Sequence, residues 1–164
     1  MKPRAVLTMM LLCGMLAGCA SPPPVNKPRS NTAVCGNFTL TISTEKSIYK
    51  SSELKPGKLL DFQVSYTYTG DRPEIEVFHS NPISLVYILT SQGEPLVEKD
   101  VLDEGCTSVL HRSEPCTYTE DGSIEYDHLG AFEPGQYKAV AYLNLTTNEK
   151  QKVACTAEIP FTIY

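Results

Sequence analysis

Cysteine and histidine are the residue types whose spacing in this chain could do chemistry. Cys106, His111 and Cys116 stand at C-x4-H-x4-C, which would place three metal-binding side chains on one short segment. A fourth ligand would have to come from elsewhere in the chain, so the spacing alone predicts no metal site. The rival interpretation of the two cysteines is a local disulfide, which an exported setting would favour.

The sequence shows no recognisable catalytic motif. Gly-x-Ser-x-Gly and Ser-x-x-Lys are absent, no Gly-rich phosphate loop occurs, and His79 and His128 stand alone. Glu74 and Glu76 alternate onto one strand face, as solvated carboxylates do far more often than a glycosidase pair. We therefore expect a protein that is not an enzyme and that uses no cofactor.

Length and composition favour one strand-rich domain. The chain has 164 residues, 41% hydrophobic and 20% charged, with 12 prolines, 10 glycines, 9 tyrosines and no tryptophan. This is enough apolar material for one core, and the residue types favour strands and turns over helices. The formal net charge of -5 argues against a nucleic-acid partner, because phosphate neutralisation needs concentrated Lys and Arg.

Residues 1–18 have the pattern of a secretory signal. Lys2 and Arg4 precede an apolar run of 14 residues, from Ala5 to Gly18, which is short for a membrane span. The run ends in Leu16-Ala17-Gly18-Cys19, which resembles the lipobox of bacterial lipoproteins. The resemblance implies cleavage before Cys19 and acylation of that cysteine, palmitate included, so that the lipid bilayer is a partner. An ordinary signal followed by a chance cysteine is the alternative.

Residues 19–32 read as a lipidated cysteine followed by a proline-rich tether. In a polyproline-like conformation the tether would reach up to about 40 Å from the membrane. Loss of Lys2 and Arg4 leaves 12 basic against 19 acidic residues, a formal charge of -7, so anionic lipid headgroups would repel the domain. Ala20-Ser21 without an aspartate looks like the outer-membrane sorting pattern, which predicts a cell-envelope location, facing the periplasm in a diderm source.

Removal of Cys13 and lipidation of Cys19 leave four cysteines for disulfides. Four cysteines in an exported domain read as two bridges with three possible connectivities. A first and a last strand often neighbour each other in a sandwich, which favours pairing Cys35 with Cys155 and leaves Cys106 to pair with Cys116.

The body, residues 33–164, has a dominant period of two. Alternation is clearest in residues 59–68 and in 37–42, while residues 137–144 are apolar on both faces, as in a central strand. Ser91-Gln92-Gly93-Glu94 and Glu120-Asp121-Gly122 read as hairpin turns, and Pro160 marks a bulge or an edge in the last strand. The pattern predicts an antiparallel immunoglobulin-like β-sandwich of about seven to nine strands. In such a fold Tyr137, which follows Pro134-Gly135, would form a tyrosine corner by bonding to backbone a few residues upstream.

Several turns resemble those of one family. The Pro-Gly turns, the strand ending in Thr69-Gly70-Asp71-Arg72-Pro73 and the late Pro-Gly-Gln-Tyr strand look like the immunoglobulin-like domain of BsuPI-type intracellular proteinase inhibitors, over about residues 48–145. The resemblance implies that fold and an inhibitor activity. The family pattern lacks cysteines at positions 106 and 116 and is not defined by a lipobox.

Two functions follow as expectations. The first is a non-enzymatic envelope lipoprotein whose domain binds a protein partner or has a structural role, and the alternative is a proteinase or hydrolase inhibitor on the exported side of the membrane. We expect the segment from Cys106 to Cys116 to be the functional loop, with Leu110, His111 and Arg112 meeting the partner.

Overall fold

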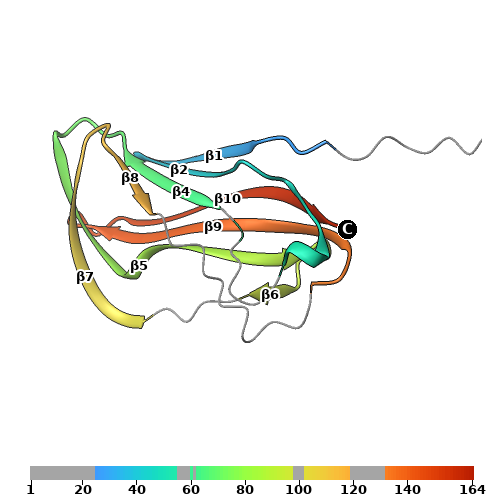
Figure 1. Ribbon diagram of the computed structural model, residues 1–164. Helices are drawn as coiled ribbons and strands as arrows, with labels where there is room; N and C mark the ends of the chain where they lie inside the picture. Colours follow the sequence, from blue (N-terminus) through green and yellow to red (C-terminus); the bar gives the residue numbers. More distant parts are fainter. Residues whose placement is uncertain (1–24, 55–59, 61, 98–101, 119–131) are drawn as a thin grey trace, which may run out of the picture.

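The computed structural model describes residues 25–54, 60, 62–97, 102–118 and 132–164 (Figure 1). The described strands are β1 Arg29–Cys35, β2 Phe38–Thr44, β3 Ile48–Tyr49, β4 Gln63–Tyr68, β5 Glu74–Thr90, β6 Pro95–Val97, β7 Leu102–His111, β8 Pro115–Tyr118, β9 Gly135–Thr147 and β10 Lys152–Ile163, with one short 3-10 helix, η1 Ser51–Glu53. They form two sheets packed face to face, which confirms the predicted all-β sandwich. The described ranges hold ten strands where about seven to nine were expected. The count is higher because it includes β3 and β6, which are only two and three residues long.

The two sheets have different sizes. The smaller sheet has the order β1-β2-β4-β8, and the larger has the order β3-β10-β9-β5-β6, with β7 also paired to β5. Every pair of neighbouring strands is antiparallel except β3 with β10. β9 lies between β10 and β5, the central place predicted from its apolar residues on both faces.

The core lies between the inner faces of the two sheets. Phe38, Leu40 and Ile42 alternate inward from β2 and are at most 1% exposed, as their period of two predicts. The ring of Phe161, on β10, lies at the centre of an aromatic group whose other members are 5.4 to 5.8 Å away between centroids: Tyr49, Phe62 and Tyr137. Phe62 directly precedes β4 of the smaller sheet, so its contact with Phe161 links the chain of that sheet to the larger one.

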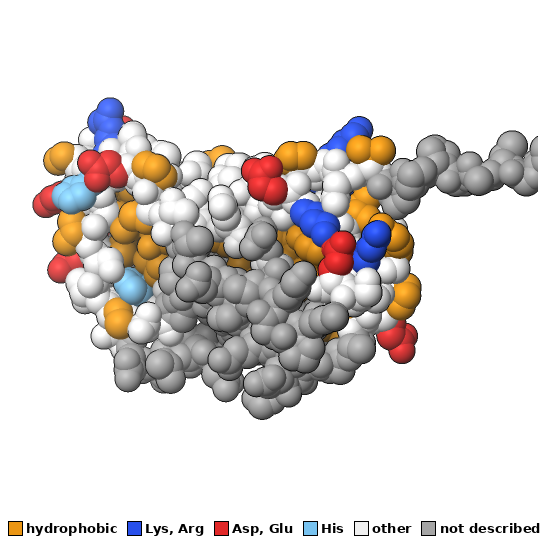
Figure 2. Space-filling view, in the orientation of Figure 1, with side chains coloured by type: hydrophobic (Ala, Val, Ile, Leu, Met, Phe, Trp, Pro, Cys, Tyr) orange, Lys and Arg blue, Asp and Glu red, His pale blue; other side chains and the backbone are white. Residues whose placement is uncertain are grey.

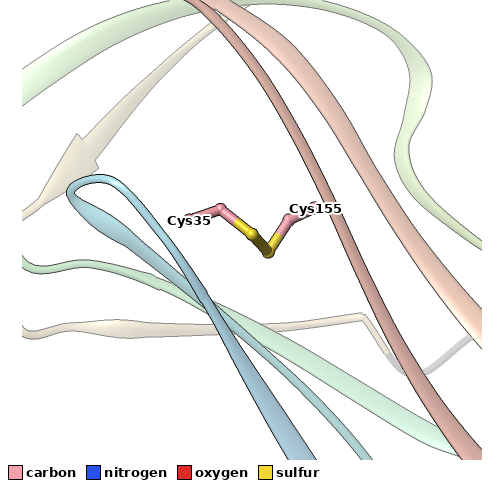
Figure 3. The surroundings of a disulfide bond; sticks show 2 residues. All are labelled: Cys35 and Cys155. Carbon is pink, nitrogen blue, oxygen red and sulfur yellow. A yellow bond between two sulfur atoms is a disulfide. The ribbon is translucent and has the colours of Figure 1, made fainter.

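A disulfide and a side-chain hydrogen bond close one side of the sandwich. Cys35, at the end of β1, is bonded to Cys155 on β10, and this confirms the first predicted pair (Figure 3). Asn31 donates a 2.9 Å hydrogen bond from its amide to the backbone carbonyl of Glu158. β1 and β10 are the edges of different sheets here, so these contacts fasten the two sheets together along this side.

The tyrosine corner forms as expected. The Tyr137 hydroxyl donates a 2.6 Å hydrogen bond to the backbone carbonyl of Glu133. The turn at Gly93 is also as predicted, with a φ of +88° and a 3.0 Å hydrogen bond from its amide to the Thr90 carbonyl. On the side away from β9, β10 pairs with β3 only at Thr162 and Ile163, so Pro160 lies at an edge position. The register of β10 with β9 is unbroken at Pro160, so there is no bulge.

The folded domain begins earlier than the predicted start at Ala33. β1 starts at Arg29, and the side chain of Asn26 is already bound to the domain. Its amide oxygen accepts hydrogen bonds from the backbone N–H groups of Ser47 (3.1 Å) and Ile48 (2.8 Å). The second half of the predicted tether is therefore part of the fold. The predicted hairpin at Asp121-Gly122 lies outside the described residues.

Candidate functional site

The segment expected to be a functional loop is mostly strand. Residues 106–111 belong to β7, and β8 begins at Pro115, so only residues 112–114 connect the two strands. The connection is tightly held, because the backbone N–H of Arg112 donates to the Pro73 carbonyl and that of Ser113 to the Tyr68 carbonyl, both at 2.8 Å. Ser113 has a φ of +63°, which a tight turn requires. We call residues 111–114 the β7–β8 corner.

The predicted bridge between Cys106 and Cys116 is wrong. Both cysteines are free thiols and partly buried. The β7–β8 corner carries the chain from one sheet to the other, so Cys106 pairs with His79 in the larger sheet while Cys116 pairs with Tyr66 in the smaller one. The two cysteines are only ten residues apart in the sequence, which suggested a disulfide across a local loop. They lie in different sheets instead, because β7 belongs to the larger sheet and β8 to the smaller one.

The Cys116 thiol lies beside the Tyr66 hydroxyl. Burial raises the pKa of Tyr66 to about 12, with a further contribution from Cys116. Burial also raises the pKa of Cys116, against the lowering effect of its hydrogen bond with Tyr66, and the charge of Glu114 raises it further. The thiolate is the reactive form of cysteine, so this environment keeps the sulfur protonated and unreactive near neutral pH.

The three residues expected to meet a partner do not share one environment. Leu110 is only 3% exposed and lies in the core, so its predicted role in binding is wrong. His111 and Arg112 are exposed. The Nδ1 atom of His111 lies 3.5 Å from a carboxylate oxygen of Glu74, and the Arg112 guanidinium donates a 3.4 Å hydrogen bond to the Asp71 carbonyl. Only two of the three residues are available at the surface.

The alternative metal site does not assemble either. Side chains alternate between the two faces of a strand, so Cys106 and Leu110 lie on the face of β7 that points into the sandwich, while His111 lies on the face that points to solvent. Among the described residues no group of three or more His, Cys, Asp and Glu side chains could hold a metal ion. The C-x4-H-x4-C spacing is therefore split between two faces and two sheets.

His79 is not isolated, contrary to its interpretation from sequence. Its Nδ1 lies 2.7 Å from the Ser80 carbonyl, and its Nε2 lies 2.8 Å from the Ser108 hydroxyl. A carbonyl can only accept, so Nδ1 carries a proton and donates to it. The contact with Ser108 ties β5 to β7 next to the point where the register of β5 with β9 shifts, between His79 and Ser84.

Comparison with known proteins adds no assignment. No family model matches the chain, and no curated protein matches it. In the ranges that the structure describes, no helix is long and apolar enough to cross a membrane. Residues 16–19, which include the predicted lipidation site Cys19, lie outside those ranges.

Sequence reasoning missed an exposed apolar pair on the outer face of the larger sheet. Phe78 on β5 is 45% exposed and Val109 on β7 is 51% exposed. Phe78 pairs with Thr107, and Val109 pairs with Glu76, so Phe78 and Val109 are diagonal neighbours on one face. The sequence signal that could have found Phe78 is the alternation in β5: Ile75 and Val77 point inward, so Phe78, one residue after Val77, points outward.

Carboxylates flank this apolar pair. Glu74 and Glu76 alternate with Ile75 and Val77 along β5 and are exposed on the same outer face as Phe78. We call Glu74, Glu76, Phe78, Val109 and Thr107 the β5–β7 surface. Figure 2 shows hydrophobic and acidic side chains at the end of the molecule where β7 and the beginning of β5 lie in Figure 1.

A second outer-face cluster lies at the centre of the same sheet. The rings of Tyr87 and Tyr142 meet edge to face, with centroids 5.6 Å apart. Val140 pairs with Tyr87 across the strands and is only 4% exposed although it points away from the core. Tyr142 remains 44% exposed.

Proposed function

We propose that this chain is a lipid-anchored cell-envelope lipoprotein whose immunoglobulin-like sandwich binds a protein partner or has a structural role, without catalysis. The observation that carries the binding role is the exposure of Phe78 and Val109 on the outer face of the larger sheet. Exposed apolar side chains rimmed by polar ones are typical of protein-binding surfaces. The anchoring role rests on the likeness of Leu16-Ala17-Gly18-Cys19 to a lipobox.

The hydrogen bonds of Asn26 bear on how far the domain would stand from the bilayer. Because Asn26 is bound to Ser47 and Ile48, the proposed tether would be limited to residues 19–25. Seven residues in a polyproline-like conformation, at roughly 3.1 Å per residue, would span about 20 Å. The domain would then lie nearer the membrane than the 40 Å expected from the sequence, and its partner would be another protein close to the surface.

Membrane fractionation tests the anchor. In the full chain the variant Cys19→Ser should move from the membrane fraction to the soluble fraction and lose incorporation of labelled palmitate, because the acidic domain has no other affinity for anionic lipid. Cys13→Ser, inside the signal, is the matched control and should stay lipidated. If Cys19→Ser remained on the membrane after a salt wash, the anchoring proposal would be wrong.

One observation favours inhibition of a hydrolase as the second candidate. The β7–β8 corner is short and held by backbone hydrogen bonds to Pro73 and Tyr68, and a rigid protruding turn is what an inhibitor needs to enter a cleft. His111 and Arg112 would be the residues presented. Inhibition of a panel of envelope and secreted proteinases by the wild-type domain, relieved by His111→Ala with Arg112→Ala, would support this candidate. Absence of inhibition across the panel would remove it.

A further inference from the structure

We propose that the outward edge of β7 and the adjoining β5–β7 surface bind a basic, extended segment of the partner protein, which adds to the larger sheet as a further strand. This inference rests on the proposed protein-binding function and specifies its site and the chemistry of its ligand. An added strand gains backbone hydrogen bonds along its length, and alternate side chains supply specificity.

The first support is the state of the β7 edge. Over the described residues β7 pairs with β5 alone, in an unbroken register from Cys106 to His111. Natural edge strands are commonly protected by lysine, proline or bulges. The ten residues of β7 contain no lysine and no proline. The register with β5 shifts between Cys106 and Leu102, so the regular part of this edge is residues 106–111, and these six residues have the backbone groups that strand addition requires.

The other described edges are less suited to this role. β1 is fastened to β10 by the Cys35–Cys155 disulfide and by the bond from Asn31 to the Glu158 carbonyl, so the edges of both strands lie along a closed side. β10 also carries Pro160 and β3 on that side. β8 has four residues and β3 has two, too few for a stable added strand.

The apolar pair supplies a second support. An added strand next to β7 would bring one face of its side chains beside Thr107, Val109 and His111, which point outward. Val109 and Phe78 would then gain apolar neighbours and lose water. An incoming segment with an apolar residue at every second position would fit these two side chains.

Charge identifies the class of segment. Glu74 and Glu76 lie on this face and are exposed, and no ion pair is found for Glu76 within the described ranges. The formal charge of residues 19–164 is -7, with 12 basic and 19 acidic residues. A segment that carries Lys or Arg beside its apolar residues would be attracted, while a second copy of this acidic chain would be repelled. The occupant is therefore a basic strand of another protein.

Defined peptides test the inference on the full-length protein in detergent. Each fluorescent ten-residue peptide alternates valine with lysine, threonine or glutamate, and anisotropy gives its Kd. We expect the lysine peptide to bind about tenfold more tightly than the glutamate peptide at low salt. Its affinity should fall as ionic strength rises from about 0.01 M to 0.15 M, because the Debye length shrinks from about 30 Å to 8 Å.

Variants and controls locate the binding. Val109→Ser, or Glu74→Lys with Glu76→Lys, should weaken binding of the lysine peptide about tenfold. Val34→Ser on β1, where Val34 is 71% exposed, and Glu45→Lys, which alters an exposed carboxylate elsewhere, should change the Kd less than about twofold. Hydrogen exchange should show new protection at alternate backbone amides of β7.

The peptide and capture experiments test the β7 site separately from the proposed function. Loss of binding in the β5–β7 variants together with protection of β7 amides supports strand addition. No binding of the lysine peptide, equal binding of the glutamate peptide, or equal loss in the Val34→Ser control overturns it. If a partner protein is captured from the envelope equally by wild type and Val109→Ser, the proposed function stands and this site is wrong. If lysine peptide binds β7 while no partner is captured, the site stands and the proposed function fails.

Discussion

The Tyr137 hydroxyl donates a 2.6 Å hydrogen bond to the Glu133 backbone carbonyl, four residues upstream. The Tyr137 ring also stacks on Phe161 and meets Phe132 edge to face. One side chain thus fixes the path of the chain into β9 and joins it to the core. Tyr137→Phe keeps the ring contacts but removes the hydroxyl, so it should destabilise the domain by about 1 kcal/mol. Urea unfolding measures this, with Tyr142→Phe, at an exposed ring, as the control that should change little.

Removal of the Ser84 hydroxyl should stabilise the domain, whereas removal of the Tyr137 hydroxyl should destabilise it. Ser84 is 1% exposed, and its hydroxyl is a buried side-chain atom with no hydrogen-bond partner among the described residues. A buried, unpaired hydroxyl destabilises a fold, so Ser84→Ala should raise the free energy of unfolding by about 1 kcal/mol. Ser47 is the matched control, since its buried hydroxyl donates a 2.9 Å bond to the Lys27 carbonyl, and Ser47→Ala should destabilise. A loss of stability in Ser84→Ala would show that its hydroxyl is satisfied.

Gly70 packs against the ring of Tyr68. A Cβ atom at Gly70 would lie 2.3 Å from the Tyr68 hydroxyl oxygen, and the Tyr68 side chain is only 3% exposed. Gly70→Ala should therefore destabilise the domain by about 1–3 kcal/mol. A Cβ at Gly105 on β7 would meet nothing within 4 Å, so Gly105→Ala should be close to neutral. Thermal unfolding of the two variants side by side makes the comparison, and equal losses would contradict the packing at Gly70.

Alkaline pH should weaken the domain through Tyr66. Burial raises its pKa to about 12 in the folded state, against about 10 for an unfolded tyrosine. The unfolded chain then releases its proton first, so stability is full below pH 10 and falls as the pH rises toward 12. Tyr66→Phe should lose less stability than wild type over this range. Denaturant unfolding at a series of pH values tests it, and parallel pH profiles would contradict the assignment to Tyr66.

Thiol counting tests the corrected cysteine pairing. In residues 19–164 carrying Cys19→Ser, which lack Cys13, unfolding without reductant should expose two thiols, Cys106 and Cys116, while Cys35 and Cys155 stay joined. Removal of the Cys35–Cys155 bridge, which closes a sequence separation of 120 residues, should cost about 4–5 kcal/mol in the chain-entropy treatment. A count of zero thiols would restore the predicted second bridge.

The fold was predictable from sequence because local signals agreed. The period of two in Phe38, Leu40 and Ile42 gave a buried face, and the apolar residues on both sides of Val140 gave a central strand. The Pro134-Gly135 turn before Tyr137 gave the corner. Each of these signals lies within a few residues, and the tertiary structure did not override them.

The candidate site was predictable only in part, because it depends on which sheet receives each strand. Cys106 and Cys116 are close in sequence, but β7 and β8 belong to different sheets, and no local pattern reports that change. Leu110 looked like part of a loop until the register placed it opposite Ile75, in the core. The side-by-side placement of Phe78 and Val109 likewise comes from the pairing of β5 with β7 and not from their spacing in the chain.

Quantitative affinity capture tests the central claim most directly. Full-length protein is purified from a detergent-solubilised membrane fraction beside the double variant Phe78→Ser with Val109→Ser, and co-purifying proteins are compared by mass spectrometry. The account predicts at least one envelope protein that is enriched with wild type and lost with the variant, while both proteins remain folded and on the membrane. Identical sets of captured proteins, no greater than those held by an unrelated lipoprotein, would contradict a protein-binding role for this surface.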